Sequence, residues 1–294
     1  MNQSVLNIEN YRILSQIFTP NIVRNIVKEN SIGLYNRKIK KHLKTNKNLT
    51  TNSQILSELY SLLEKDYRCE YIYKNQIFQN LISKYSLENS SIFSEFKVGG
   101  SIADLFFLNG SIRIYEIKTE LDTLTKLEKQ IEDYFKVANK VYIVTDENYS
   151  EKILSKYENS KVGIIKFTSD FKLCFVKEAN EKNDGFDFET LFKLLRKQEY
   201  LDLIKLNFEF IPDVPNTQIF KVSYKLLQGI DIVLFQKQVL NVLKQRKIER
   251  PDLLLSERTP SELKLICNTL DFNEDDYEQL YHFLNKQNLC ISRI

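Results

Sequence analysis

The stretch EFKVGGSIADLFFLNGSIRIYEIK, residues 95–118, decides the fold of this chain. Two of its segments, 102–108 and 112–118, are rich in β-branched and aromatic side chains, and the dipeptide Asn109-Gly110 lies between them. An Asn-Gly pair between two such segments is a strong signal for a β-hairpin. We therefore expect two antiparallel strands joined by a short turn.

Three charged residues interrupt these apolar strands: Asp104, Glu116 and Lys118. Burying a carboxylate in such a place is costly unless another group pairs with it. Two carboxylates and one ammonium that lie close together can hold a divalent cation and a water molecule. The alternative is a half-exposed hairpin that carries these charges on its solvent face.

The hairpin register tests whether the three charges can meet. Side chains alternate between the faces of a strand, so Glu116 and Lys118 share a face. Asp104 joins them only if the numbers of paired residues add to an even number, and a two-residue turn gives an odd one. A shared site therefore requires a three-residue turn, for example with Gly110 left-handed, or a bulge within a strand.

A helix is expected after the hairpin, over about residues 123–138, with Gln130 and Tyr134 one turn apart at its apolar edge. An Asp in the first strand, a Glu-x-Lys in the second and a Gln-x-x-x-Tyr on the next helix together resemble the PD-(D/E)XK nuclease superfamily, in its RecB-like branch. The run Glu116-Ile-Lys-Thr-Glu-Leu-Asp-Thr-Leu is also similar to a bacterial group within that superfamily. The resemblance covers residues 66–178 and implies an α/β fold, a restriction-endonuclease-like mixed sheet flanked by helices.

Glu-x-Lys alone is a weak signal, because the chain also contains it at residues 95–97 and 262–264. Only the copy at 116–118 follows a hairpin strand with an embedded Asp and precedes a helix with Gln-x-x-x-Tyr. The combination carries the resemblance.

The resemblance implies roles for the matching residues. Asp104 and Glu116 would hold Mg²⁺ or Mn²⁺, with the carbonyl of Ile117 as an extra ligand. Lys118 would orient or help deprotonate the attacking water, which the metal activates. Gln130 would hydrogen-bond a phosphate or base, and Tyr134 would stack or donate its hydroxyl. The alternative for these last two is an amphipathic helix that merely covers the sheet.

The first core helix of the superfamily often carries a further acidic residue near the metal. Glu70 is the candidate here, since it shares a helix face with Tyr73 and Ile77, and Glu88 is the reserve. The alternative is an ordinary glutamate at a helix start, favoured there by the helix dipole.

A basic run lies between residues 30 and 57, a span without any acidic residue. Its cations are Arg37, Lys38, Lys40, Lys41, Lys44 and Lys47. The run is interpreted as a surface that tracks nucleic-acid phosphates, which would make binding salt-dependent. The alternative is a solvated helix face, which most charge runs are.

The whole chain has 294 residues, 43% of them hydrophobic, and a formal net charge of +3. We expect a helical region over 1–65, the nuclease-like core over 66–178, a polar linker and a helical region over 186–294. This last region carries no catalytic pattern, and the sequence leaves four roles open for it: binding DNA, regulating the nuclease, forming a homodimer or binding a protein partner. Without a membrane-spanning apolar run or a signal peptide, we expect a cytoplasmic protein.

Several other classes of site lack their residues. The four cysteines form no C-x-x-C pair, so zinc knuckles and iron–sulfur clusters are not expected. Because only two histidines are present, HNH-type nucleases and HD phosphohydrolases are not expected. Because there is no G-x-S-x-G or P-loop motif, neither a serine hydrolase nor an ATPase is expected. The resemblance implies a Mg²⁺- or Mn²⁺-dependent nuclease that hydrolyses phosphodiester bonds, and its RecB-like helix favours DNA as the substrate, with a role in repair or phage defence. The rival is an inactive nucleic-acid-binding or regulatory module on the same scaffold.

Overall fold

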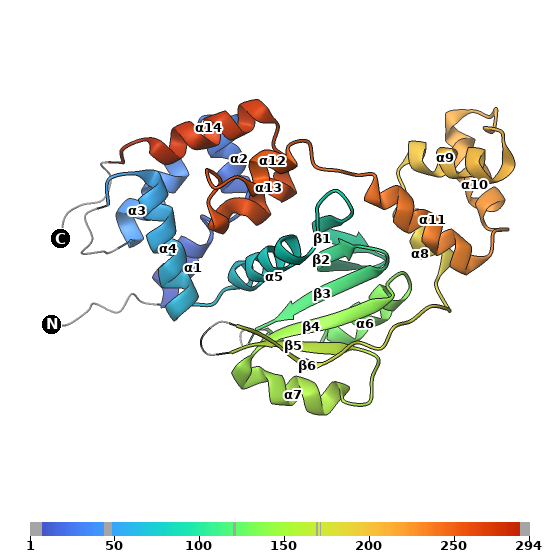
Figure 1. Ribbon diagram of the computed structural model, residues 1–294, viewed down its shortest axis with the longest axis horizontal. Coiled ribbons are helices and arrows are strands. Elements are labelled where there is room, and N and C mark those ends of the chain that lie inside the picture. Colours follow the sequence, from blue (N-terminus) through green and yellow to red (C-terminus); the bar gives the residue numbers. More distant parts are fainter. Residues whose placement is uncertain (1–7, 44–48, 120–121, 169, 171, 289–294) are drawn as a thin grey trace. The chain divides into compact units, whose positions relative to one another are not determined.

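The computed structural model describes residues 8–43, 49–119, 122–168, 170 and 172–288 (Figure 1). The chain divides into two compact units, one made of residues 1–84 and 248–294 and the other of residues 85–247. These units differ from the three consecutive regions expected from the sequence. Residues up to 84 group with the C-terminal end of the chain, and residues 186–247 group with the sheet.

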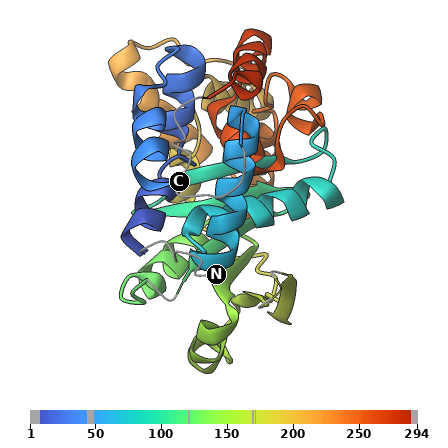
Figure 2. The same ribbon diagram turned by 90° about the vertical axis from the view of Figure 1, so that its left-hand side faces the viewer.

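The first unit is helical in its described residues. Its elements are α1 (Ile8–Ser15), α2 (Pro20–Lys28), α3 (Gly33–His42), α4 (Asn52–Asp66), α5 (Glu70–Lys84), α12 (Pro251–Leu255), η1 (Ser261–Leu263), α13 (Lys264–Leu270) and α14 (Glu274–Asn285). Helices from the two ends of the chain, blue and red in Figure 2, pack together, since α14 contacts α2 and α4, and α13 contacts α5. Helices thus occupy most of the described residues of the expected N-terminal region 1–65.

The sheet of the second unit has six strands in the part of the chain that the structure describes. They are β1 (Ser91–Val98), β2 (Ser101–Leu108), β3 (Ile112–Lys118), β4 (Lys140–Asp146), β5 (Gly163–Phe167) and β6 (Leu173–Lys177). The strands lie side by side in chain order. β3, β4 and β5 run parallel, whereas β1–β2, β2–β3 and β5–β6 are antiparallel. The expected mixed sheet with flanking helices is confirmed.

Helices connect the parallel strands, as crossovers between parallel strands require. α6 (Leu127–Phe135) packs on β2 and β4, and α7 (Glu147–Tyr157) packs on β4 and β5. α6 begins later than expected, because the Asp122 side chain accepts hydrogen bonds from Thr119 and does not cap the helix. Among the described residues, no helix is long and apolar enough to cross a membrane.

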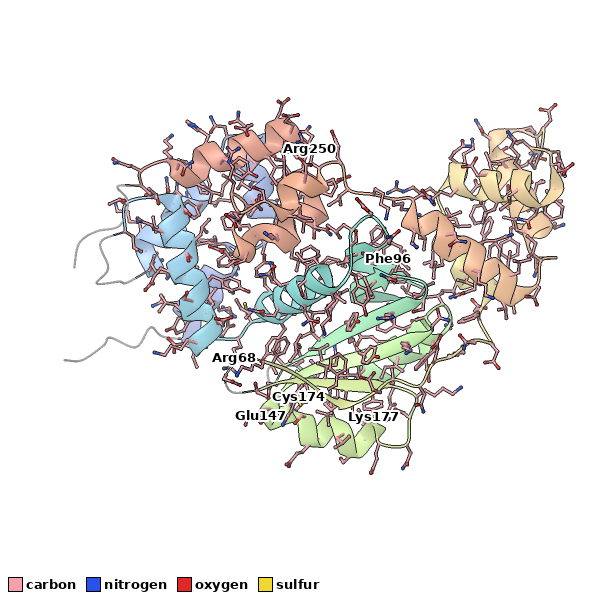
Figure 3. All side chains as sticks on the ribbon, viewed as in Figure 1. Arg68, Phe96, Glu147, Cys174, Lys177 and Arg250 are labelled. Atoms are coloured by element: carbon pink, nitrogen blue, oxygen red, sulfur yellow. The ribbon has the colours of Figure 1, made fainter. Side chains whose placement is uncertain are left out.

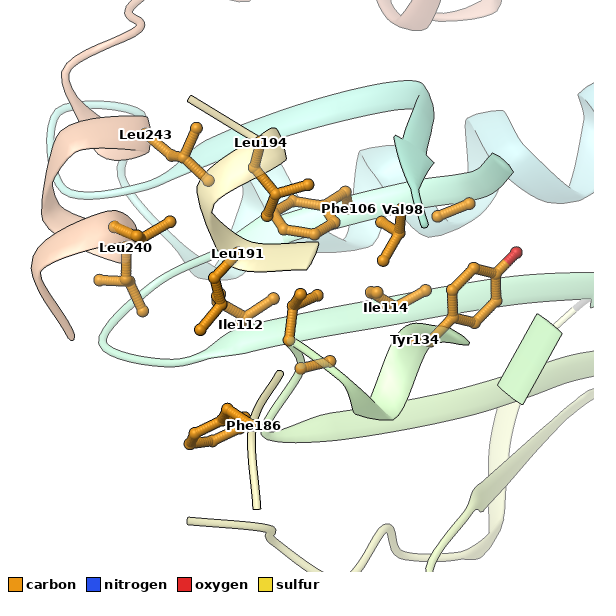
Figure 4. Packing of buried hydrophobic residues seen from close by; sticks show 14 of the residues in the cluster. Val98, Phe106, Ile112, Ile114, Tyr134, Phe186, Leu191, Leu194, Leu240 and Leu243 are labelled. Carbon is orange, nitrogen blue, oxygen red and sulfur yellow. The ribbon is translucent and has the colours of Figure 1, made fainter. Parts of the chain in front are cut away.

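Four more helices complete the second unit: α8 (Phe188–Lys193), α9 (Lys197–Phe208), α10 (Asn216–Leu227) and α11 (Ile232–Lys244). Arg196 is extended and separates α8 from α9. Figure 4 shows the core that joins these helices to the sheet. Phe106, Ile112 and Ile114 of the sheet share one buried cluster with Leu191 of α8 and Leu240 of α11.

Three of the four cysteines lie in the described part of the chain. Cys69, Cys174 and Cys267 are free thiols, and Figure 3 shows Cys174 on β6. Cys290 lies outside the described residues. Burial raises the pKa of the Cys267 thiol to about 12, so this side chain behaves as a small apolar group.

Candidate functional site

The turn between β2 and β3 has the three residues that a shared site requires. Leu108 pairs with Ile112, and Gly110 between them is left-handed, with φ of +67°. The register therefore places Asp104 directly across from Glu116, on the same face of the sheet. The expectation about the turn is confirmed.

Glu116 is buried and receives three hydrogen bonds. Its Oε1 accepts from Nζ of Lys118 at 2.7 Å and from Nε2 of Gln130 at 2.5 Å. Its Oε2 accepts from the hydroxyl of Tyr134 at 2.6 Å. A carboxylate that is only 2% exposed needs such donors to replace the hydrogen bonds it would make with water. The structure thus brings together four of the residues that the sequence singled out.

Tyr134 acts as a neutral donor in this arrangement. Its hydroxyl also lies 2.8 Å from the carbonyl oxygen of Ile102. Burial, followed by the charge of Glu116, raises the pKa of Tyr134 far above its usual range. The phenol therefore keeps its proton and fixes the Glu116 carboxylate between β3 and α6.

Asp104 is held by the neighbouring strand. Its Oδ2 accepts a hydrogen bond from the backbone N–H of Ile117 at 2.7 Å, and the residue is only 8% exposed. This contact orients the carboxylate toward β3. The role of the Ile117 carbonyl as a metal ligand stays a prediction.

Gln130 carries an unused acceptor. Its Oε1 is buried, and no described residue donates a hydrogen bond to it. Flipping the amide would not help, because it would turn Oε1 toward the Glu116 carboxylate, where two acceptors repel. The site therefore offers a hydrogen-bond acceptor to a water molecule or a substrate group.

A buried carboxylate on α6 positions that helix. Asp133 accepts hydrogen bonds from Ser101 Oγ at 2.8 Å and from Lys136 Nζ at 2.7 Å. A Cβ at Gly99, whose φ is +59°, would lie 3.3 Å from Asp133 Oδ1. Burial acts to raise the pKa of Asp133, but the hydrogen bonds from Lys136 and Ser101 hold it below its usual value. These contacts thus fix the position of α6 relative to the β1–β2 turn.

Glu95 is a further candidate site residue, which the sequence pattern alone did not single out. Ser94 and Phe96, on either side of it, pair with Leu105 and Ala103, so Glu95 lies opposite Asp104. Its carboxylate has an oxygen within 4.8 Å of one of Asp104. Its φ of +54° is left-handed, which is uncommon for a residue other than glycine. The two-residue turn at 99–100 was the available signal, because it sets this register.

A profile of the family described as "Bacteriophage P4 protein cII" matches residues 63–267, more than half of the chain. The chain belongs to the bacteriophage P4 protein cII family. Protein cII of Enterobacteria phage P4 is 31% identical over 99 residues, which are 33% of this chain and 37% of that protein. The chain thus matches little more than a third of the length of this relative.

One solved structure was also matched. A protein of unknown function from Silicibacter pomeroyi, SPO1766, superposes with a TM-score of 0.32 and 14% sequence identity. The match covers 47% of this chain and 90% of that chain. A TM-score at this level carries no conclusion about fold or function.

The segment matched by the P4 cII family includes all the site residues described above and also Glu70. Glu70 begins α5 in the first unit and forms an ion pair with Lys74, one turn later. Glu88 is exposed and precedes β1. A role for Glu70 or Glu88 near a metal stays a prediction.

The basic run lies outside the segment matched by the P4 cII family. Four of its cations lie on α3: Arg37, Lys38, Lys40 and Lys41. All but Lys38 are exposed, and Lys38 Nζ donates to Gln16 Oε1 at 2.6 Å. Burial and the neighbouring lysines lower the pKa of His42 on the same helix. Lys44 and Lys47 lie outside the described residues.

Proposed function

We propose that this protein is a Mg²⁺- or Mn²⁺-dependent nuclease that hydrolyses phosphodiester bonds in DNA. One observation carries the proposal: the hairpin register sets Asp104 across from Glu116, with Lys118 bonded to Glu116. The order of hairpin, α6 and parallel strand β4 further supports a PD-(D/E)XK-like core.

The donor set suits a hard divalent cation. Mg²⁺ and Mn²⁺ prefer carboxylate oxygens, and Asp104 and Glu116 supply these from adjacent strands. Both carboxylates are buried, and Lys118 forms an ion pair with Glu116. Glu95 adds a third carboxylate beside Asp104. Several carboxylate oxygens close together suit the oxygen-rich coordination of a hard divalent cation.

A metal bound at these carboxylates would lower the pKa of a water molecule and stabilise negative charge on the phosphate. The side chains around the two carboxylates would supply the remaining chemistry. Lys118 can orient a water or contact a phosphate oxygen from its place beside Glu116. Gln130 Oε1 can accept a hydrogen bond from that water. Tyr134 keeps its proton and holds Glu116 in position.

DNA is proposed as the substrate because the pair Gln130 and Tyr134 matches the RecB-like motif. Both residues lie on α6, and both donate to Glu116. The cations of α3 supply a candidate surface for phosphates. A role in repair or phage defence is part of the same proposal.

The test is a cleavage assay with labelled plasmid and single-stranded DNA, in Mg²⁺ or Mn²⁺, with and without chelator. We expect metal-dependent cleavage that the chelator stops and that Glu116→Gln abolishes. A matched control is Glu151→Gln, which changes an exposed glutamate on α7 of the same unit. DNA binding without cleavage under any condition would instead indicate the inactive binding module.

A further inference from the structure

A second feature of the sheet-containing unit is a hollow of about 410 Å³ on α8 and α10. Its lining residues are Glu189, Lys193, Phe220, Lys221, Tyr224, Lys225 and Gln228. The volume falls within the range of small-molecule sites. Three lysines against one glutamate make the lining cationic.

Two of the cations in this hollow are available to a ligand. Lys193 is already paired with Glu189, one turn before it on α8. Lys221 and Lys225 are exposed, and neither forms an ion pair with any residue in the described part of the chain. They are one turn apart on α10, so their side chains lie on one face about 6 Å apart along the helix axis.

An aromatic ring is fixed beside these cations. Phe220 is 50% exposed, although it is a large apolar side chain. Its ring makes edge contacts with Phe192, at 5.2 Å between centroids, and with Tyr200, at 6.3 Å. These contacts hold the ring, so a ligand that stacks on it loses little conformational entropy on binding.

From these observations we infer that the hollow binds single-stranded nucleic acid, with a base against Phe220 and phosphates at Lys221 and Lys225. A stacking ring beside a cationic track is how proteins bind single strands without sequence preference. A duplex keeps its bases stacked inside and would meet only the lysines. An acidic peptide would satisfy the lysines but offers no planar group for the ring. The inference rests on the proposed function for the class of ligand and adds a strand-holding site to it.

The test measures binding of a labelled oligo-dT by fluorescence anisotropy, in chelator and over a range of salt concentrations. Because no metal is present, the result does not depend on cleavage. Lys221→Glu/Lys225→Glu should weaken binding at least tenfold and flatten the salt slope by roughly 1.4, at about 0.7 per lost phosphate contact. The matched control is Lys205→Glu/Lys237→Glu, which reverses two exposed lysines of α9 and α11.

The aromatic part of the inference has its own variants. Phe220→Leu keeps apolar packing against Phe192 but removes the stacking surface, and it should weaken oligo-dT binding roughly tenfold. Phe220→Tyr keeps the ring and should bind like the parent. Duplex DNA of the same length should be insensitive to Phe220→Leu.

Two results would overturn the inference. One is unchanged oligo-dT affinity in both Phe220→Leu and the double lysine variant. The other is a poly-glutamate peptide that competes as well as unlabelled oligo-dT. If either occurs while the parent still cleaves DNA, the proposed function stands and the strand-holding site does not. Failure of the parent to bind or cleave any nucleic acid would reject both.

Discussion

Two regions of the molecule contain the same pattern, Glu-x-Lys, in different surroundings. On β3, residues two apart share a face, and Lys118 lies 2.7 Å from Glu116. At η1 and α13 the backbone is helical, where residues two apart do not face each other. Lys264 there donates to the carbonyl of Leu255, and the contact of Glu262 is with the hydroxyl of Ser261.

The electrostatic outcome differs as well. Glu262 is 8% exposed, and burial raises its pKa above the usual value. Burial disfavours the charged form of Lys264 as well, and therefore lowers its pKa. Glu116 is buried more deeply but receives hydrogen bonds from three side chains. The Glu-x-Lys pattern alone therefore does not make a site. A site also needs the geometry of a strand and hydrogen-bond partners from a second element.

The largest effect is expected at Lys118, with Lys264 as its matched control. Lys118→Met keeps the apolar stem and should lower turnover on DNA by roughly 10²–10⁴-fold, the contribution of a positioned acid–base group. Lys264→Met should leave turnover unchanged. Calorimetric Mn²⁺ binding and thermal unfolding of both variants separate lost chemistry from lost folding. Near-parental cleavage by Lys118→Met would make Lys118 a structural residue.

A second prediction concerns Glu95, the glutamate of a third Glu-x-Lys copy. Glu95→Gln should weaken Mn²⁺ binding by roughly 10–100-fold, the range seen when groups around a metal are removed. Glu95→Gly should weaken it equally, yet raise the free energy of unfolding by about 1 kcal/mol, because glycine adopts a φ of +54° without strain. Calorimetry and chemical denaturation give the two quantities. Unchanged Mn²⁺ affinity in both variants would remove Glu95 from the site.

The third prediction concerns exposed lysines that are not part of a Glu-x-Lys pattern. Lys40→Glu/Lys41→Glu on α3 should weaken DNA binding by a few-fold and flatten its salt slope by about one per lost phosphate contact. Metal affinity should not change. The measurement is binding of duplex DNA in chelator at several salt concentrations. An unchanged affinity and slope would return α3 to the status of a solvated face.

The smallest effect is expected at Glu262. Its folded-state pKa is raised, so ionisation costs the folded protein stability as pH rises above the usual value of 4.5. Glu262→Gln should therefore melt higher than the parent at pH 7, and this advantage should vanish near pH 4. Glu257→Gln, an exposed change nearby, should show no such pH dependence. A lower melting temperature for Glu262→Gln at pH 7 would contradict this account.

Local chemistry predicted much of the candidate site from the sequence. The charges on β2 and β3 required a three-residue turn, and Gly110 supplied the left-handed residue for it. Glu95 escaped because its importance depends on the β1–β2 register and not on its own neighbours in the chain. The Oε1 of Gln130 became visible only once the donors around Glu116 were known.

The division into units could not be read from local patterns. It depends on contacts between residues far apart in the chain. Tyr71 donates to the carbonyl of Glu262 at 2.6 Å, and Asn75 donates to that of Ser261 at 3.1 Å. Nothing in the spacing of α5 indicates that its partner lies nearly two hundred residues later. Composition and periodicity predict each helix but not its neighbour.

The discontinuous unit has a consequence for how the chain folds as it is made. Residues 85–247 form a continuous unit and can complete it while residues 248–294 are still being added. Ribosomes add about 5–20 residues per second, so α13 and α14, which contact α2, are synthesised on the order of 10 seconds after it. During that interval its apolar side chains, among them Ile22 and Ile26, lack their final cover. The N-terminal helices are therefore the segment most exposed to chaperones and to aggregation during synthesis.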